Sequence, residues 1–446
     1  MDFLCVQFHH TINLILFIAL LSYFVNAMDG SVVVTGLTRI AHDLQLSQSG
    51  LSWIQSGYML TFGGCMLLGG RLGDSKGRKS VLLAALFIFC VSSIVAGAAM
   101  SGPVMIGARL WQGVGAALLA PTSLALLMDT FHGQERMRAV AWYTSVSGLG
   151  TSIGLVLGGF IADYASWRLG FFINVPITIL MMVLTMQVVT NDGASHKSFD
   201  YVGTLLSIGG FIALVYGING STEPLRWLVL AFVLLSAFVL WQKRVTYPLT
   251  PLILFHHPVR LGAYIARLLF MCGMFGFWFY ITQCFQLVKS YSPTVTGLAF
   301  VPMTFCSFLA AITLPVLLRR FGNFKIFFLA GLCLLVGFLW FLPQNMHGAY
   351  VNIYLGPLML LGFGQGFIMS PLTNLGIRDT SGDMAGAASG VVNVAHQLGG
   401  AIGLSIMVAA NETMPNIIDK FHRSLEISVL FIVVMLVLGI ATLRKS

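Results

Sequence analysis

The chain has 446 residues, of which 57% are hydrophobic and only 9% are charged. Soluble proteins carry about 25% charged residues, and a soluble protein of this length could not cover its surface with so few charges. The net charge of +9 does not indicate nucleic-acid binding, because no basic face or nucleic-acid motif accompanies it. The sequence therefore predicts a polytopic membrane protein whose basic residues mark cytoplasmic loops.

Fourteen apolar runs are long enough to span a bilayer, which takes about 20 mostly apolar residues per helix. Strands are not expected, because these runs do not alternate in polarity. The predicted fold class is therefore all-α and integral to the membrane. The expected spans are residues 11–36, 49–70, 80–99, 102–130, 139–163, 168–190, 201–219, 225–242, 261–288, 294–318, 325–343, 350–373, 385–411 and 424–443.

The basic residues predict how these spans are oriented. With both termini in the cytoplasm, about 17 of the 24 Lys and Arg residues fall on the inner side, against about 7 in the opposite orientation. We therefore expect a multi-pass protein of the cytoplasmic membrane with both termini inside. Two polar stretches divide the chain into six, two and six spans, over residues 1–190, 191–260 and 261–446.

The stretch after the second span reads Gly70-Arg71-Leu72-Gly73-Asp74-Ser75-Lys76-Gly77-Arg78-Lys79. Glycines allow a tight turn between helices, and the basic cluster predicts a cytoplasmic loop. The spacing resembles the signature loop of the major facilitator superfamily. That resemblance implies an inner gate that includes Gly70, Asp74, Arg78 and, at the inner end of the fourth span, Asp129. A solvated helix-end charge is the alternative interpretation of Asp129.

The fourth span contains Ala108-Arg109-Leu110-Trp111-Gln112-Gly113-Val114-Gly115. A buried arginine in lipid is costly and usually has a partner and a function. This segment resembles the superfamily motif found in the same helix of proton-coupled members.

The fifth span carries a glycine stripe that would let another helix approach closely. It resembles the antiporter motif of the superfamily, although Leu155 stands where a proline is usual. Ordinary small-residue packing is the alternative to a special role in antiport. The stripe consists of Gly150, Gly154, Gly158 and Gly159.

Further segments resemble the drug:proton antiporter-2 family of multidrug exporters, and the compact length is similar to its shorter Gram-positive members. The resemblance covers almost the whole chain. It implies two six-helix bundles around a central cavity, two extra helices at the periphery, and alternating access by rocking of the bundles. The segments are Trp167-Arg168, Phe172–Pro176, Phe199–Gly203, Thr282–Gln286, Gly297–Pro302 and Gly390–Gly403.

Asp29 is the most informative residue of the first span. It shares a face with Asn26, three residues earlier, and lies about 10 Å from the outer end by helix rise. A carboxylate within the membrane indicates a functional site, here one that exchanges protons or attracts a cationic substrate; a purely structural ion pair is the alternative. Arg109 lies at the same depth, so we expect it to contact Asp29.

Three other positions complete the candidate residues. His396, near mid-membrane, could relay protons or be a hydrogen-bonded packing residue. Glu412, at the outer end of the thirteenth span, could face the substrate path or be a solvated loop acid. Asp163 and Arg168 are expected to form a weak outer surface pair.

The predicted function is proton-coupled export of lipophilic cationic or zwitterionic drugs by a monomer. The expected partners are drugs, protons and the lipid bilayer, with no nucleic acid. The alternative is a proton-coupled transporter of a specific metabolite or ion, because a fold does not determine a substrate. The sequence contains no catalytic or nucleotide-binding motif, so we do not expect an enzyme. The seven cysteines form no CxxC pair, so we expect no metal and no cofactor besides the coupling proton.

Overall fold

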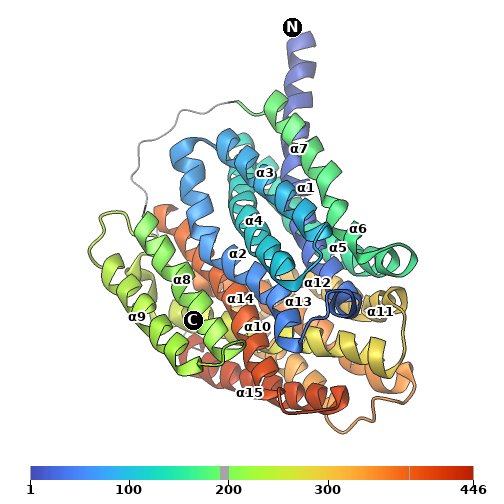
Figure 1. The fold of residues 1–446 in the computed structure, drawn as a ribbon. Helices are drawn as coiled ribbons and strands as arrows, with labels where there is room; N and C mark the ends of the chain where they lie inside the picture. Colours follow the sequence, from blue (N-terminus) through green and yellow to red (C-terminus); the bar gives the residue numbers. More distant parts are fainter. Residues whose placement is uncertain (1, 191–199, 381, 445–446) are drawn as a thin grey trace.

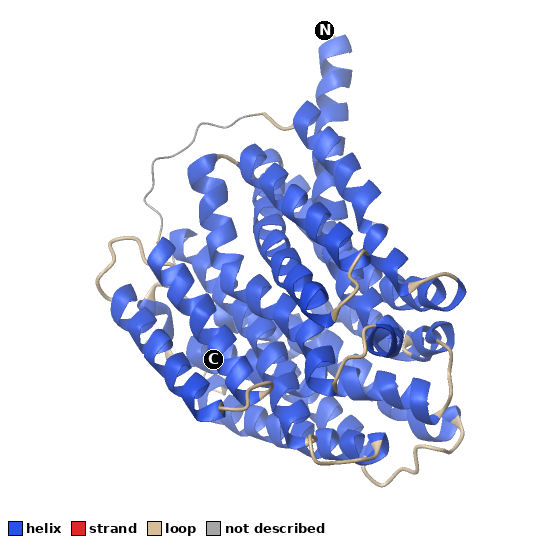
Figure 2. Cartoon of the chain, viewed as in Figure 1, coloured by secondary structure: helices blue, strands red, loops and turns tan. Residues whose placement is uncertain are grey.

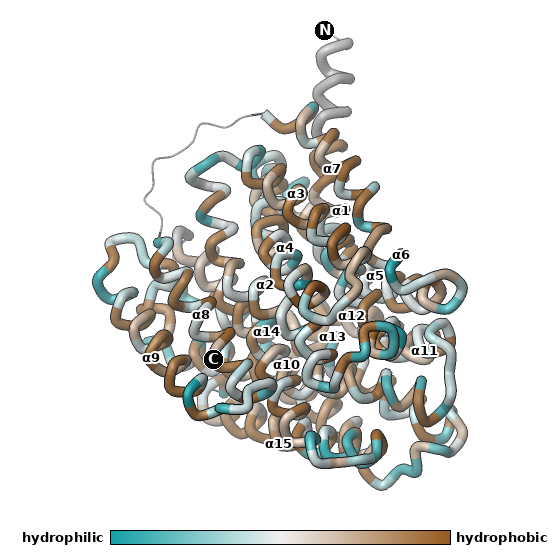
Figure 3. Tube along the Cα trace, viewed as in Figure 1, coloured by the Kyte–Doolittle hydropathy of each residue, from teal (hydrophilic) through white to brown (hydrophobic). Residues whose placement is uncertain are grey.

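The computed structural model describes residues 2–190, 200–380 and 382–444, and all regular structure in those ranges is helical (Figure 2). Apolar residues lie along the helix bodies, while polar residues gather at helix ends and in loops (Figure 3). Lipid offers no hydrogen bonds to the backbone, so apolar spans form helices that satisfy their own backbone groups. We call the end at which α1 begins the inner end, and the opposite end the outer end.

The first group of helices packs around α1 and α4. α1 lies against α5, while α4 lies against both α2 and α3. Its members are α1 (Asp2–Asp43), α2 (Gln48–Lys76), α3 (Arg78–Gly97), α4 (Gly102–Thr130), α5 (Gly133–Tyr164), α6 (Trp167–Phe172) and α7 (Asn174–Val188).

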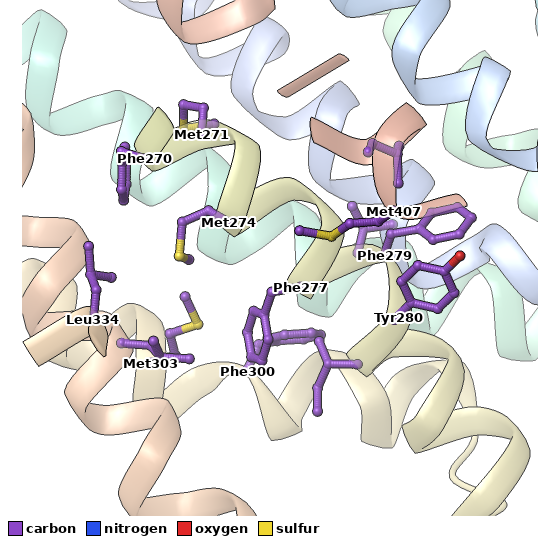
Figure 4. Close-up of a cluster of buried hydrophobic side chains, with 14 of the residues drawn as sticks. Phe270, Met271, Met274, Phe277, Phe279, Tyr280, Phe300, Met303, Leu334 and Met407 are labelled. Carbon is purple, nitrogen blue, oxygen red and sulfur yellow. The ribbon is translucent and has the colours of Figure 1, made fainter. Parts of the chain in front are cut away.

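The second group packs around α10, which contacts α14 and α15, while α12 lies against α13. Its members are α10 (Pro258–Gln283), α11 (Pro293–Ala299), α12 (Val301–Phe341), α13 (Gly356–Gly376), α14 (Gly382–Ala410) and α15 (Ile417–Leu443), with the short turns η1 (Leu252–Phe255), η2 (Cys284–Val288) and η3 (Val351–Leu355). Figure 4 shows its core, where aromatic rings and flexible methionines fill the space between α10 and its neighbours.

Two helices between the groups, α8 (Tyr201–Ile218) and α9 (Pro224–Gln242), pack against each other at one side of the molecule (Figure 1). The side chain of Asp200 caps α8 by accepting a hydrogen bond from the Gly203 amide at 2.8 Å. At the outer end, Trp53 of α2 donates its indole N–H to the carbonyl of Asn219 at 3.0 Å. The pair is therefore attached to the first group through α2.

All fourteen expected spans are present as helices in the described ranges. α6 and α7 together form one span, while α11 and α12 form two, because Gly322 breaks α12 with a φ of +77°. Eleven stretches are long and apolar enough to cross a membrane, and Pro293–Phe341 counts once among them. We propose that residues 1–190, 191–260 and 261–446 are the three parts of the chain.

The turn expected across Gly70–Lys79 is shorter than the glycine spacing suggested. α2 continues to Lys76, so Gly70 lies within the helix. The chain turns at Gly77 alone, with a φ of +88°, and α3 begins at the next residue. Glycine suits this position because residues with a Cβ rarely adopt such a φ.

Candidate functional site

Asp29 lies inside the first group of helices and is 1% exposed. Its Oδ2 atom accepts a hydrogen bond from Nη1 of Arg109 on α4 at 2.6 Å. The predicted contact between these two residues is therefore present. Buried pairs of opposite charge are stable only where geometry is close and the remaining polar atoms are satisfied.

The second carboxylate oxygen of Asp29 is also fully engaged. Its Oδ1 atom accepts hydrogen bonds from Gln112 on α4 and Asn174 on α7, both at 2.8 Å. Gln112 donates in addition to Ser93 of α3 at 3.0 Å. Three helices thus meet at one carboxylate, and Gln112 connects it to a fourth, α3.

Arg109 is held as tightly as its partner. Its Nε donates to the carbonyl of Ile54 on α2 at 3.1 Å, and its Nη1 donates to Gln112 at 2.6 Å. Its guanidinium carbon lies 4.3 Å from the ring centre of Tyr58, a cation–π distance. The result is a neutral ion pair. Its loss or protonation would alter hydrogen bonds that join α1, α2, α3, α4 and α7.

Asn26 shares the face of α1 with Asp29 but does not join this network. Both polar atoms of its side chain are buried without a hydrogen-bond partner. An amide in this state costs free energy until it finds a partner. Asn26 therefore does not support Asp29 in this structure, and the hydrogen-bonding capacity of its amide is unused.

Two residues of the predicted inner gate are in contact. Arg78 at the start of α3 donates from Nε to Oδ2 of Asp129 at 3.1 Å. A Cβ at Gly73 would lie 2.9 Å from the guanidinium of Arg78, so this glycine gives the arginine room. Gly70 is less crowded, with its nearest neighbour at 3.9 Å. The side chain of Asp74 lies outside the described part of the structure.

The glycine stripe of α5 packs against the backbone of α1. A Cβ at Gly150, Gly154 or Gly158 would lie 2.6–2.9 Å from backbone atoms of that helix, closer than real Cβ atoms approach. Gly159 instead faces the carbonyl of Pro293 on α11, in the second group. The close packing inferred from the stripe is therefore present, and its last glycine joins the two groups.

Hydrogen bonds between the two groups close the outer end, a set we call the outer closure. Gln286 donates to the carbonyl of Thr35 at 2.9 Å and accepts from Thr38. Gln48 donates to Gln283 at 2.9 Å. The outer closure also includes the amide of Thr294, which donates to Asp163 at 3.4 Å.

The expected pair of Asp163 with Arg168 is wrong. Asp163 binds Arg39 of α1 at 3.3 Å. Arg168 donates to the carbonyls of Gly97 and Ala99 at the end of α3, at 3.0 and 2.5 Å. The expectation relied on the closeness of Asp163 and Arg168 in the sequence. Arg168 instead binds the free carbonyls at the end of α3, which attract a cation.

His396 and Glu412, both predicted near α14, lie in different environments. His396 accepts a hydrogen bond at Nδ1 from Arg267 of α10 at 3.1 Å. Glu412 is exposed in the turn after α14. The structure does not bring either of them to Asp29.

Sequence analysis did not identify Gln112 and Asn174 as hydrogen-bond donors to Asp29, although both lie inside motifs described above. It also missed Arg267, whose signal was a single arginine within the apolar run 261–288. Polar residues of this kind in a membrane span usually face a partner or a cavity.

The described part of the chain thus forms fourteen spans, with a buried carboxylate–arginine pair inside the first group of helices. The chain matches the Major Facilitator Superfamily over residues 19–404. It belongs to that superfamily, and it is a transporter rather than an enzyme.

Several relatives that align over most of the chain are named as drug resistance or export proteins. The puromycin resistance protein of Streptomyces alboniger is 35% identical and aligns over 85% of this chain and 78% of its own length. The cephamycin export protein of Amycolatopsis lactamdurans is 32% identical, over 88% and 84% of the two chains. The solved structure of the nucleoside transporter NupG has a TM-score of 0.65 at 15% identity, covering 96% of this chain and 99% of NupG, and shows the shared fold.

Proposed function

We propose that this transporter exports lipophilic cationic or zwitterionic drugs across the cytoplasmic membrane in exchange for protons, as a monomer with both termini inside. The observation that supports proton coupling is the buried Asp29–Arg109 pair, 2.6 Å apart. The resistance and export proteins among its relatives support a drug as cargo. The resemblance to the drug:proton antiporter-2 family supports the combination of the two.

Protonation of Asp29 supplies the coupling step. The carboxylate accepts bonds from Arg109, Gln112 and Asn174, and a proton on it removes the charge that balances Arg109. A stranded buried charge costs several kcal/mol, so Arg109 and α4 must move to a new partner. This shift of α4 against α1 is our proposed link between proton binding and the change of access.

Direct capture of the drug by Asp29 is not part of this scheme. Its oxygens are saturated by protein donors, and the residue is 1% exposed. Drug and proton therefore compete through the position of α1 and α4. Gly150, Gly154 and Gly158 transmit the movement to α5, because they hold α5 directly on the backbone of α1.

Transport of ethidium in everted membrane vesicles tests this proposal. The wild type should accumulate ethidium only when a pH gradient is imposed. Asp29→Asn should insert in the membrane at normal levels and lose gradient-driven uptake. Asp419→Asn, at an exposed acid near the outer end of α15, is the matched control and should behave as the wild type. Gradient-driven uptake by Asp29→Asn at the wild-type rate would refute the coupling role.

A further inference from the structure

Arg267 is a second buried arginine, in the other group of helices. It is 4% exposed and lies in the first half of α10. Its Nε donates to Nδ1 of His396 on α14, and its Nη1 donates to the carbonyl of Met369 on α13, both at 3.1 Å. Three helices of the second group therefore hold one guanidinium.

No carboxylate of the described residues forms an ion pair with Arg267. α10 and α13 contain no Asp or Glu, and the acid of α14 is Asp383, 13 residues before His396. That separation is about 20 Å along a helix. The charge of Arg267 is thus balanced by a histidine ring and one carbonyl.

The other buried arginines, Arg109 and Arg260, are stabilised by different partners. Arg109 has Asp29 as its counter-ion. Arg260 is 7% exposed and donates to the carbonyls of Leu254, Arg378 and Asp379, where free backbone acceptors attract a cation. Among the described residues, Arg267 has neither a counter-ion nor such a set of carbonyls. A buried cation without a counter-ion costs several kcal/mol, and an arginine kept in this state within a membrane span indicates a functional site.

The helix that carries the guanidinium, α10, contacts α1 across the boundary between the two groups of helices. On α1, Asn26 carries the amide without partners. His396 is only partly buried. A methyl group added at Gly30, one turn beyond Asn26, would meet no atom within 4 Å, so this face of α1 borders open space.

We propose that Arg267, oriented by His396, binds the carboxylate or another acidic group of a lipophilic substrate between the two groups of helices. The Asn26 amide is a second donor to the same group. This inference rests on the proposed export function for the identity of the ligand as cargo, and it adds a binding site for those cargo compounds that have an anionic end. Zwitterions fit it, whereas simple cations do not use this site.

The test compares two probes that differ in one charge, dansylglycine and its methyl ester. Binding to the purified full chain in lipid nanodiscs is measured by fluorescence anisotropy, without any gradient. The wild type should bind the acid about tenfold more tightly than the ester, since hydrogen bonds to charged groups are stronger than those to neutral groups. Arg267→Gln should abolish this preference, and Arg267→Lys should retain part of it.

Two further variants make the result decisive. Arg226→Gln, at an exposed position of α9, is the matched control and should keep the full preference. His396→Gln leaves the arginine in place and should weaken acid binding without affecting the ester. Equal affinities of the wild type for both probes, no binding of the acid, or an unchanged preference in Arg267→Gln would overturn the proposal. Because no gradient is used, such a failure is distinct from a failure of ethidium export.

Discussion

Arg109 and Arg267 are both arginines buried in apolar helices, but their charges are balanced in different ways. Arg109 has a carboxylate at 2.6 Å, whereas Arg267 has a histidine nitrogen and a carbonyl at 3.1 Å. A paired charge is stable inside one group of helices, while one without a counter-ion depends on what approaches from the other group. The first arrangement suits proton exchange, and the second suits recognition of an acidic ligand.

The Asp29–Arg109 pair leads to a prediction about stability. Asp29→Asn leaves Arg109 buried without a counter-ion, so we expect a loss of about 3–5 kcal/mol and a lower melting temperature in detergent. The double variant Asp29→Asn/Arg109→Gln removes both charges and should recover most of that loss. Ethidium uptake should stay absent in both variants. Equal melting temperatures for the single and double variants would contradict the pairing energy assigned here.

At the scale of elements, α5 is held by close backbone contact rather than by side-chain interlocking. Its stripe approaches α1 so closely that a Cβ at Gly154 would lie 2.8 Å from the carbonyl of Met28. Helices that meet this way pack through small residues and van der Waals contact, the usual means of association in lipid. Leu155 in place of a proline leaves this contact intact.

We therefore expect Gly158→Val to destabilise the transporter by about 1–3 kcal/mol, the usual cost of overpacking. A Cβ at this position would lie 2.6 Å from Cα of Val32. Gly107→Val on α4 is the control, since a Cβ there meets nothing within 4 Å. Thermal unfolding followed by tryptophan fluorescence measures both. Similar melting temperatures for the two variants would show that α5 tolerates a wider spacing.

The turn between α2 and α3 supports another prediction. Arg78 binds Asp129 at the inner end of α4, so it links α3 to α4 without touching the buried site. Arg78→Ala should slow ethidium uptake in vesicles several-fold while its equilibrium binding is unchanged. Arg136→Ala, at an exposed basic residue of the inner end, serves as control. If binding is lost while the transport cycle proceeds at its normal rate, the gate role is wrong.

At the scale of the whole molecule, the two groups of helices meet along α2 and α14 and at the outer closure. The outer closure consists of a few hydrogen bonds, and beside it α5 packs against α11, where Gly159 meets the backbone of Pro293. Each hydrogen bond contributes about 0.5–1.5 kcal/mol net. A small set of such bonds can stabilise the state in which the outer end is closed, and it is weak enough for the outer end to open during an alternating-access cycle.

Gln286→Leu should therefore favour opening of the outer end. The substitution removes the bonds to Thr35 and Thr38, which should increase the open population by about tenfold for two hydrogen bonds. Double electron–electron resonance between spin labels at Tyr164→Cys and Val295→Cys measures the distance across this end. Thr442→Val, which loses a bond within α15, is the control. An unchanged distance distribution in Gln286→Leu would show that other contacts hold the outer end.

The membrane class, the fourteen spans and the contact of Asp29 with Arg109 could be predicted from the sequence, because they follow from local properties: apolar length, charge at helix ends, and equal depth of two charges in helices of one group. The superfamily was indicated by the resemblance of several motifs. Depth constrains such a pair strongly, because lipid leaves buried charges few alternatives.

Only the tertiary structure decided which polar groups complete the site. It brought Gln112 and Asn174 to Asp29 and left Asn26 without a partner. It also paired Asp163 with Arg39 rather than with Arg168, and it placed His396 against Arg267. Helical periodicity predicts the face on which a residue lies, but the neighbour of that face depends on how helices rotate and cross. Those angles are determined by packing over the whole bundle.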